Sequence, residues 1–75
     1  MTVTILHTHS NDGKRYCELK FDKYMPYKAV VYESRGPGPY GEDWMITHES
    51  QPTWDLVKAT QAYRRFVRKY IVKGE

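Results

Sequence analysis

The chain has 75 residues, of which 40% are hydrophobic and 15% aromatic, and its formal net charge is +3. This size predicts one domain over residues 1–75, and the aromatic content argues against disorder. The only cysteine, Cys17, excludes an internal disulfide and therefore the class of small cross-linked secreted proteins. The first residues lack a signal-peptide pattern, and the longest apolar run, 29–32, is far too short to cross a bilayer. We therefore expect a soluble cytoplasmic protein without a membrane partner.

Alternating and β-branched segments predict three strands in the first half of the chain, over residues 2–9, 15–22 and 27–34. Ser-Asn-Asp-Gly at 10–13 is typical of a hairpin turn, because Asn, Asp and Gly tolerate positive φ. In the first strand, Val3, Ile5 and His7 are expected to share one side.

A glycine- and proline-rich segment follows the third strand. Residues 35–41 (RGPGPYG) predict a long, stiff loop that reaches Asp43, because proline cannot donate a hydrogen bond within a sheet. A fourth strand is expected at 44–49. No connection between strands is long enough for a parallel crossover, so the sheet should be antiparallel.

The last part of the chain predicts an amphipathic helix over about 54–73, with Thr53 as the N-cap and Gly74 as the terminator. Its apolar residues fall within an arc of about 140°. The fold class is therefore α+β: a four-stranded antiparallel sheet packed on one C-terminal helix, β-β-β-β-α.

The alternation assigns side chains to the two faces of the sheet. The face toward the helix is expected to present Cys17, Leu19, Phe21, Ala29, Val31, Trp44 and Ile46. The opposite face is expected to present Tyr16, Val30, Tyr32 and Met45 among Glu18, Lys20 and Lys28. One helix cannot cover both faces, so Tyr16 and Tyr32 are candidates for a secondary contact surface, which would bind a second copy of the chain, a target protein or unpaired bases. Ordinary cross-strand packing is the alternative explanation of these tyrosines.

The positive charge is concentrated in the predicted helix. Residues 1–52 carry a net charge of −1 and residues 53–75 a net charge of +4, and the stretch 56–73 contains no acid. Its cations are Lys58, Arg64, Arg65, Arg68, Lys69 and Lys73. Cations near a helix C-terminus stabilise its dipole by about 0.3–1 kcal/mol each, which explains part of this pattern without a partner. The dipole does not explain the missing acids, since a Glu four residues from a Lys or Arg would add stability.

We therefore interpret Lys58, Arg64, Arg65, Arg68 and Lys69 as candidate partner-binding residues for an anionic surface. That surface is either an acidic patch of a larger protein or nucleoprotein complex, or the phosphates of a nucleic acid. Base-edge readout is not expected, because the stripe offers only Gln61 for it. Tyr40 and Arg35, on the stiff loop, are further candidates, since a rigid exposed aromatic with flanking charges suits a protein interface; a simple surface connection is the alternative.

Catalytic chemistry is not indicated. Cys17 alternates with apolar residues and is expected to be a core residue, and no glycine-rich phosphate loop is present. His7 and His9 could point at one metal only if His48 or Cys17 supplied a third ligand, so no metal site and no cofactor are predicted.

In its size, its sheet-plus-helix layout and its lack of catalytic groups, the chain resembles small phage-encoded inhibitor proteins, including anti-CRISPR types. This resemblance implies a non-catalytic protein that inhibits or modulates a larger host protein or nucleoprotein complex. A sequence-independent nucleic-acid-binding protein is the alternative, and a homodimer on the open sheet face is compatible with both.

Overall fold

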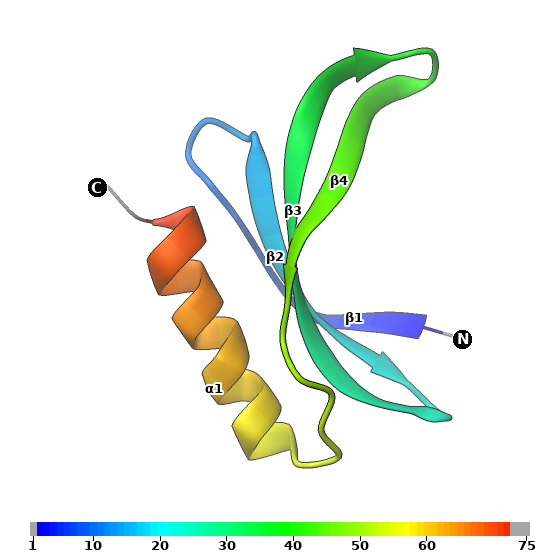
Figure 1. The fold of residues 1–75 in the computed structure, drawn as a ribbon, viewed down its shortest axis with the longest axis vertical. Helices are drawn as coiled ribbons and strands as arrows, with labels where there is room; N and C mark the ends of the chain where they lie inside the picture. Colours follow the sequence, from blue (N-terminus) through cyan, green and yellow to red (C-terminus); the bar gives the residue numbers. More distant parts are fainter. Residues whose placement is uncertain (1, 73–75) are drawn as a thin grey trace.

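The computed structural model describes residues 2–72 and contains four strands followed by one helical segment. The strands are β1 (Thr2–His9), β2 (Arg15–Asp22), β3 (Met25–Gly38) and β4 (Gly41–Glu49). They form one antiparallel sheet in the order β1-β2-β3-β4. The helix α1 (Leu56–Phe66) runs into a π-helical turn, η1 (Val67–Ile71), and lies across one side of the sheet (Figure 1). This confirms the predicted β-β-β-β-α fold class.

The segment rich in glycine and proline is not the long loop that the sequence predicts. Residues of β3 and β4 stay paired up to Gly38 and Gly41, so only Pro39 and Tyr40 form the connection. The strands predicted at 27–34 and 44–49 are therefore too short, and the loop predicted from Arg35 to Asp43 is wrong. In Figure 1 this hairpin extends beyond the rest of the sheet.

The prolines are tolerated because this part of β3 has a free edge. The last residue of β3 that pairs with β2 is Glu33, opposite Arg15, and beyond it the side of β3 toward β2 is unpaired apart from one bond at Ser34. The register with β4 also shifts between Ser34 and Pro37. Prolines are accepted at such edges and bulges because no ladder hydrogen bond is lost there. Gly38 permits the close turn, since a Cβ on it would lie 3.2 Å from the carbonyl oxygen of Gly41.

The helix begins later than predicted. Asp55, not Thr53, is the N-cap, and its Oδ1 accepts hydrogen bonds from the backbone N–H groups of Val57 (2.9 Å) and Lys58 (3.4 Å). Thr53 instead exchanges backbone hydrogen bonds with Tyr27, which ties the chain to β3 before the helix starts. The helical segment reaches Ile71 through the π turn. Lys73 and the predicted terminator Gly74 lie outside the described residues.

The core lies between α1–η1 and the two central strands. Its buried members are Cys17, Leu19, Ala29, Val31, Ala59, Tyr63 and Ile71. The four strand residues in this cluster are those that alternation predicts for the helix side. The Tyr63 hydroxyl also hydrogen-bonds the Thr8 hydroxyl, which joins the helix to the edge strand β1. Phe21 lies at the margin of the core, half-buried with its ring 5.3 Å from that of Tyr27.

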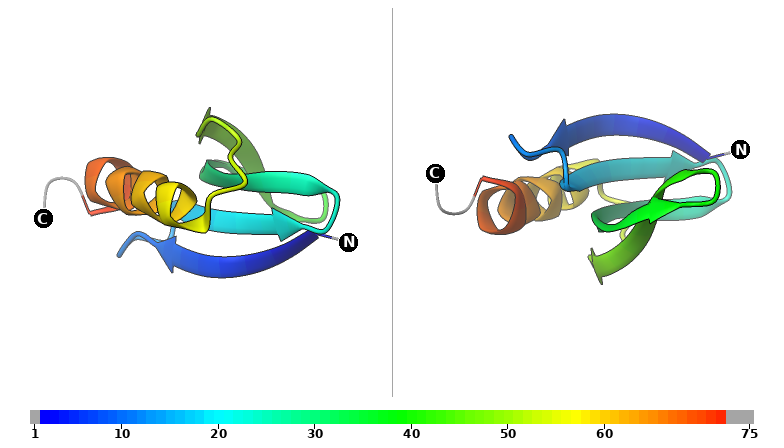
Figure 2. Two further views of the ribbon diagram at one scale, coloured as in Figure 1. Left: turned by 90° about the horizontal axis from the view of Figure 1, so that it is seen from below. Right: turned by 90° about the horizontal axis from the view of Figure 1, so that it is seen from above.

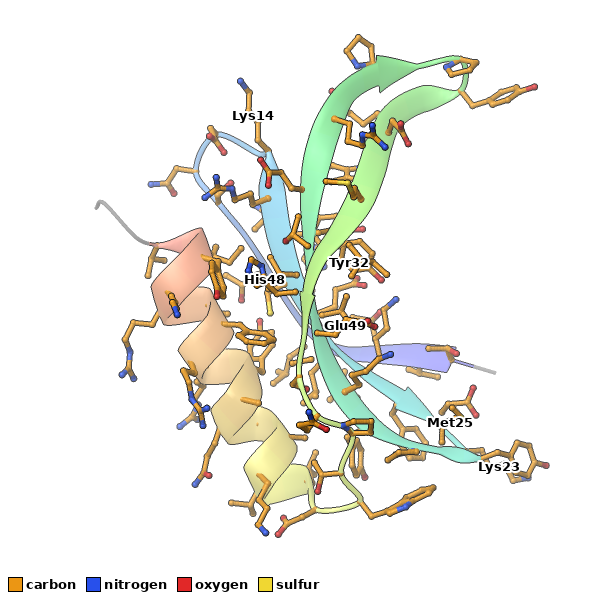
Figure 3. The ribbon with its side chains drawn as sticks, in the orientation of Figure 1. Lys14, Lys23, Met25, Tyr32, His48 and Glu49 are labelled. Atoms are coloured by element: carbon orange, nitrogen blue, oxygen red, sulfur yellow. The ribbon has the colours of Figure 1, made fainter. Side chains whose placement is uncertain are left out.

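Three side chains of β4 lie on the side opposite to the predicted one. Trp44 pairs with Ser34 and contacts the ring of Tyr16, while Ile46 pairs with Tyr32, so both lie on the face away from α1. Met45 pairs with Glu33 and lies on the helix side. The cause is a register shift in which Thr47 is an extra residue between the partners of Val31 and Tyr32. This extra residue reverses the alternation of side chains along β4. His48, beyond the shift, points toward α1 (Figure 3).

A second irregularity changes the first strand. The register of β1 shifts between Thr4 and Leu6, so Val3 and Leu6 pair with helix-side residues of β2 while His7 pairs with Glu18 on the other side. The expectation that Val3 and His7 share one side is therefore wrong. No helix within residues 2–72 has the length and apolarity needed to cross a membrane.

Candidate functional site: a basic helix and an uncovered sheet face

The helical segment presents five cations to solvent. Lys58, Arg64, Arg65, Arg68 and Lys69 are all exposed. Within residues 2–72, none of the five forms an ion pair with a carboxylate. Lys69 does lie over the Tyr70 ring, with its Nζ 5.4 Å from the ring centroid. The sequence prediction of an unpaired basic surface on the helix therefore agrees with the described structure, and Lys73 lies outside it.

The cations of the sheet are treated differently. The Arg15 Nη2 lies 3.9 Å from the Glu33 Oε1. The Lys20 Nζ lies 3.9 Å from the Glu18 Oε1, and the Lys28 Nζ lies 2.7 Å from the Glu49 Oε1. Glu33 and Glu49 supply their carboxylates from a neighbouring strand, and Glu18 supplies its carboxylate from the same strand as Lys20. The helix has no acid to offer after its N-cap. Three cations of the sheet thus have a carboxylate partner, whereas none of the five on the helix has one within residues 2–72.

These five cations of the helix form a basic stripe. It is about 16 Å long from Lys58 to Lys69, at 1.5 Å per residue. Arg68 and Lys69 sit on the π turn, whose wider winding is marked by the hydrogen bond from the Val72 N–H to the Val67 carbonyl (3.0 Å). Such turns occur often at functional sites. The stripe is long enough to meet several anionic groups at once.

A shallow depression runs beside the first half of the stripe. Lys58 and Arg65 border it from the helix, and the chain at 50–53 closes the other side with Ser50, Gln51 and Thr53. Its volume is about 290 Å³. Cationic side chains next to hydroxyl and amide groups are suited to bind a carboxylate or phosphate oxygen.

Tyr40 and Arg35 are not brought to the basic helix. Both belong to the β3–β4 hairpin, whose tip lies at the end of the molecule away from the start of α1 and bends to the side opposite the helix (Figure 1). Tyr40 is fully exposed at that tip. The predicted contact residues therefore fall on two separate surfaces.

Figure 2 shows α1 on one side of the sheet, and the other side carries a row of packed rings. Tyr16 stacks on Tyr32, with ring centroids 4.6 Å apart and 22° between planes. Trp44 meets Tyr16 edge-on at 4.8 Å, and His7 lies 5.0 Å from Tyr16 on its other side. His9 continues the row, with its ring centroid 5.7 Å from that of His7. Burial, with the neighbouring Glu18 charge second, raises the pKa of Tyr16 above its ordinary value.

These rings use their faces on one another. Tyr32 has Tyr16 on one ring face, and the Lys20 Nζ lies 4.8 Å from its ring centroid and hydrogen-bonds its hydroxyl. A base that stacks on a protein needs a free ring face. The arrangement therefore does not favour the expectation that Tyr16 and Tyr32 stack on unpaired bases.

The nucleophile and metal candidates are separated by the sheet. His7 and His9 lie on the uncovered side, where the His7 Nδ1 is 3.1 Å from Glu18, while Cys17 and His48 lie on the helix side. Neither can serve as the third ligand, and no group of three metal-ligating side chains forms among the described residues. Burial raises the pKa of the Cys17 thiol to about 12, which makes it a poor nucleophile at neutral pH.

The sequence analysis missed the contribution of Trp44 and Ile46 to the uncovered face. The pairing of Ile46 with Tyr32 places both side chains on that face. This pairing depends on the bulge at Thr47, which has no signature in the sequence. In the comparisons with known proteins, no family model, curated protein or solved structure matched the chain.

Proposed function

We propose that this protein is a non-catalytic binding protein that inhibits or modulates a larger host protein or nucleoprotein complex, in the manner of phage-encoded inhibitors. Its basic helix docks on an acidic surface of that target. The observation that carries the proposal is the set of five exposed cations on α1–η1 without a carboxylate partner among residues 2–72. An acidic partner would supply carboxylates to the helix, as Glu18, Glu33 and Glu49 supply them to three cations of the sheet.

Electrostatics and packing both support this role. Long-range attraction from one charged stripe speeds encounter with an oppositely charged surface, and arginines add bidentate hydrogen bonds to carboxylates on contact. The apolar side of the helix is held by the core through Ala59, Tyr63 and Ile71, so the stripe is presented in a fixed orientation. A preorganised surface loses less conformational entropy on binding.

Direct binding of nucleic-acid phosphates by the same stripe is the second candidate. It is favoured by the length of the stripe, about 16 Å, which spans more than one phosphate. Base-specific contacts are not part of this candidate, because the exposed side of the helix offers Gln61 as its one amide.

The test is affinity capture from the native host with the tagged protein, with and without nuclease. The decisive variant combines Arg65→Gln, Arg68→Gln and Lys69→Gln, which removes three exposed charges without touching the core. A protein captured by the wild type in the presence of nuclease and lost in this variant supports the first proposal. Capture that disappears with nuclease favours the second.

A matched control carries Lys14→Gln, Arg15→Gln and Lys23→Gln. These three residues are equally exposed and lie off the helix, so the net charge falls by the same amount. The control should bind as the wild type does. If both variants lost the captured partner equally, net charge alone would explain the binding. If both retained it equally, the role of the helix would be refuted.

A further inference from the structure

Within residues 2–72, no other element covers the face of the sheet away from α1. Val30 is only 1% exposed, although it points away from the helical core, because side chains of its own face surround it. Tyr32 and Ile46 line the same groove as Val30, and Ile46 is itself 50% exposed. The uncovered face therefore has its own apolar layer, which is still open to solvent.

This layer surrounds a groove at one end of the face. The groove has a volume of about 260 Å³ and is lined on its apolar side by Met25, Pro26, Val30, Tyr32, Ile46 and Pro52. Figure 3 shows Met25 near the β2–β3 turn and Tyr32 on the side of the sheet away from α1. At the other end of the sheet, the β3–β4 tip carries Tyr40, which is 102% exposed. The chain thus presents an apolar recess and a protruding aromatic ring at opposite ends of the sheet.

We propose that the uncovered face is a homodimer interface in which Tyr40 of each copy occupies the groove of the other. The β3–β4 tip lies toward one end of the long axis of the molecule and the β2–β3 turn toward the other, and both lie on the side away from α1 (Figure 1). A two-fold axis parallel to the short dimension of the face places the tip of one copy over the turn of the other. The same operation makes both Tyr40 contacts at once, as a closed symmetric dimer requires.

The charges around the groove favour a second copy over other partners. Its rim carries two cations, Lys20 and Lys28, and two acids, Asp22 and Glu49. In the proposed dimer this rim faces the β3–β4 hairpin of the other copy, which carries Arg35, Glu42 and Asp43, so both contacting surfaces carry charges of both signs. The rim gives a purely anionic partner no net attraction. The ring faces of Tyr16 and Tyr32 are also occupied, which argues against a nucleic acid on this side.

The area of the face is adequate. The molecule measures 35 Å along its length and 16 Å across its strands, which gives a footprint of about 560 Å² before side chains are added. A footprint of this size corresponds to an interface at the lower end of the standard range, which is about 600–1,000 Å² per partner. The two basic helices would lie on the outer sides of this dimer, so dimerisation and helix docking do not compete.

Sedimentation velocity of the purified chain over the micromolar range tests the proposal. The wild type should form a dimer whose fraction rises with concentration. Ile46→Lys, which places an unpaired charge in the contact, should be monomeric throughout, and Tyr40→Ser should weaken dimerisation by about tenfold or more. Both side chains are half or fully exposed, so the variants should keep the wild-type circular dichroism spectrum.

The matched control is Val3→Lys. Val3 is 48% exposed on an edge strand, as Ile46 is, but it lies on the helix side of the sheet. This variant should dimerise as the wild type does. A wild type that stays monomeric at the highest concentration overturns the proposal, and so does a dimer that Val3→Lys breaks and Ile46→Lys leaves intact. The helix variant with Arg65, Arg68 and Lys69 neutralised should still dimerise, which separates this inference from the proposed function.

Discussion

The hydroxyl of Tyr63, in the middle of α1, hydrogen-bonds the hydroxyl of Thr8 on the edge strand β1, 55 residues away in the sequence. The ring of Tyr63 is buried among the core residues, and this burial raises the pKa of the hydroxyl. One side chain thus anchors the helix to the central strands by packing and to β1 by a hydrogen bond.

We expect Tyr63→Phe to lower the free energy of unfolding by about 0.5–1.5 kcal/mol, because one hydrogen bond is lost and the ring remains. Tyr63→Ala should cost about 3–5 kcal/mol, because it also leaves a cavity. Urea denaturation measures both. Thr8→Val is the matched control for the hydrogen bond, and a double variant with Tyr63→Phe should cost less than the sum of the two. Strict additivity would contradict the contact.

The helix start offers a second prediction. Asp55→Ala should cost about 0.5–2 kcal/mol, since the N–H groups of Val57 and Lys58 lose their acceptor. Asp55→Asn should restore most of this stability, because Asn also caps well. Thermal unfolding followed by circular dichroism compares the two. Equal loss in both variants would show that the Asp55 charge, acting on the helix dipole, matters more than the cap.

Cys17 predicts the behaviour of the protein in alkali. The pKa of its thiol is about 12 in the folded chain, compared with 9.0 for an exposed thiol. Because the unfolded state loses this proton first, stability is fully present below pH 9 and falls as pH rises from about 9 to about 12. The slope is up to about 1.4 kcal/mol per pH unit. Cys17→Ala should flatten this fall, with a remainder from Tyr16 and Tyr63, whose pKa values are also raised by burial.

The same burial protects Cys17 from reagents. At neutral pH, alkylation by iodoacetamide should require unfolding, and its rate should therefore rise steeply with urea. Mass spectrometry of the modified chain follows the reaction. Rapid labelling of the native protein at neutral pH would contradict the buried position.

Salt dependence distinguishes the two candidate partners of the basic helix. If phosphates are bound, electrophoretic shifts with generic duplex and single strands should weaken with salt at a log–log slope of about −2 to −4, since three to five cations take part. The variant with Arg65→Gln, Arg68→Gln and Lys69→Gln should lower the magnitude of this slope by about 2–3. No shift at low salt would remove the nucleic-acid candidate and leave the acidic protein surface.

The β-β-β-β-α order, the bounds of the first two strands and the central core residues could be predicted from the sequence. Alternation of Cys17 and Leu19, and of Ala29 and Val31, marks the buried side directly. The exposed cations of the helix were also predictable, because the stretch 56–73 contains no acid that could pair with them.

The register shifts at Ile5 and Thr47 could not be predicted, and they decide the sides of β1 and β4. A shift of one residue reverses every side chain beyond it, and its energy depends on cross-strand contacts that local sequence does not encode. This is why Trp44 and Ile46 join Tyr32 on the uncovered face, while His48 stacks on Tyr70 with ring centroids 3.9 Å apart.

The sequence alone therefore determined the order of the elements, the central core and the place of the positive charge, since each depends on spacing within one segment. Only the tertiary structure decided that the glycine- and proline-rich segment is a projecting hairpin, and that Tyr40 lies away from the basic helix. It also decided which rings share the uncovered face. These features depend on pairing between distant segments, where free edges and register shifts override the local preferences of proline and of alternation.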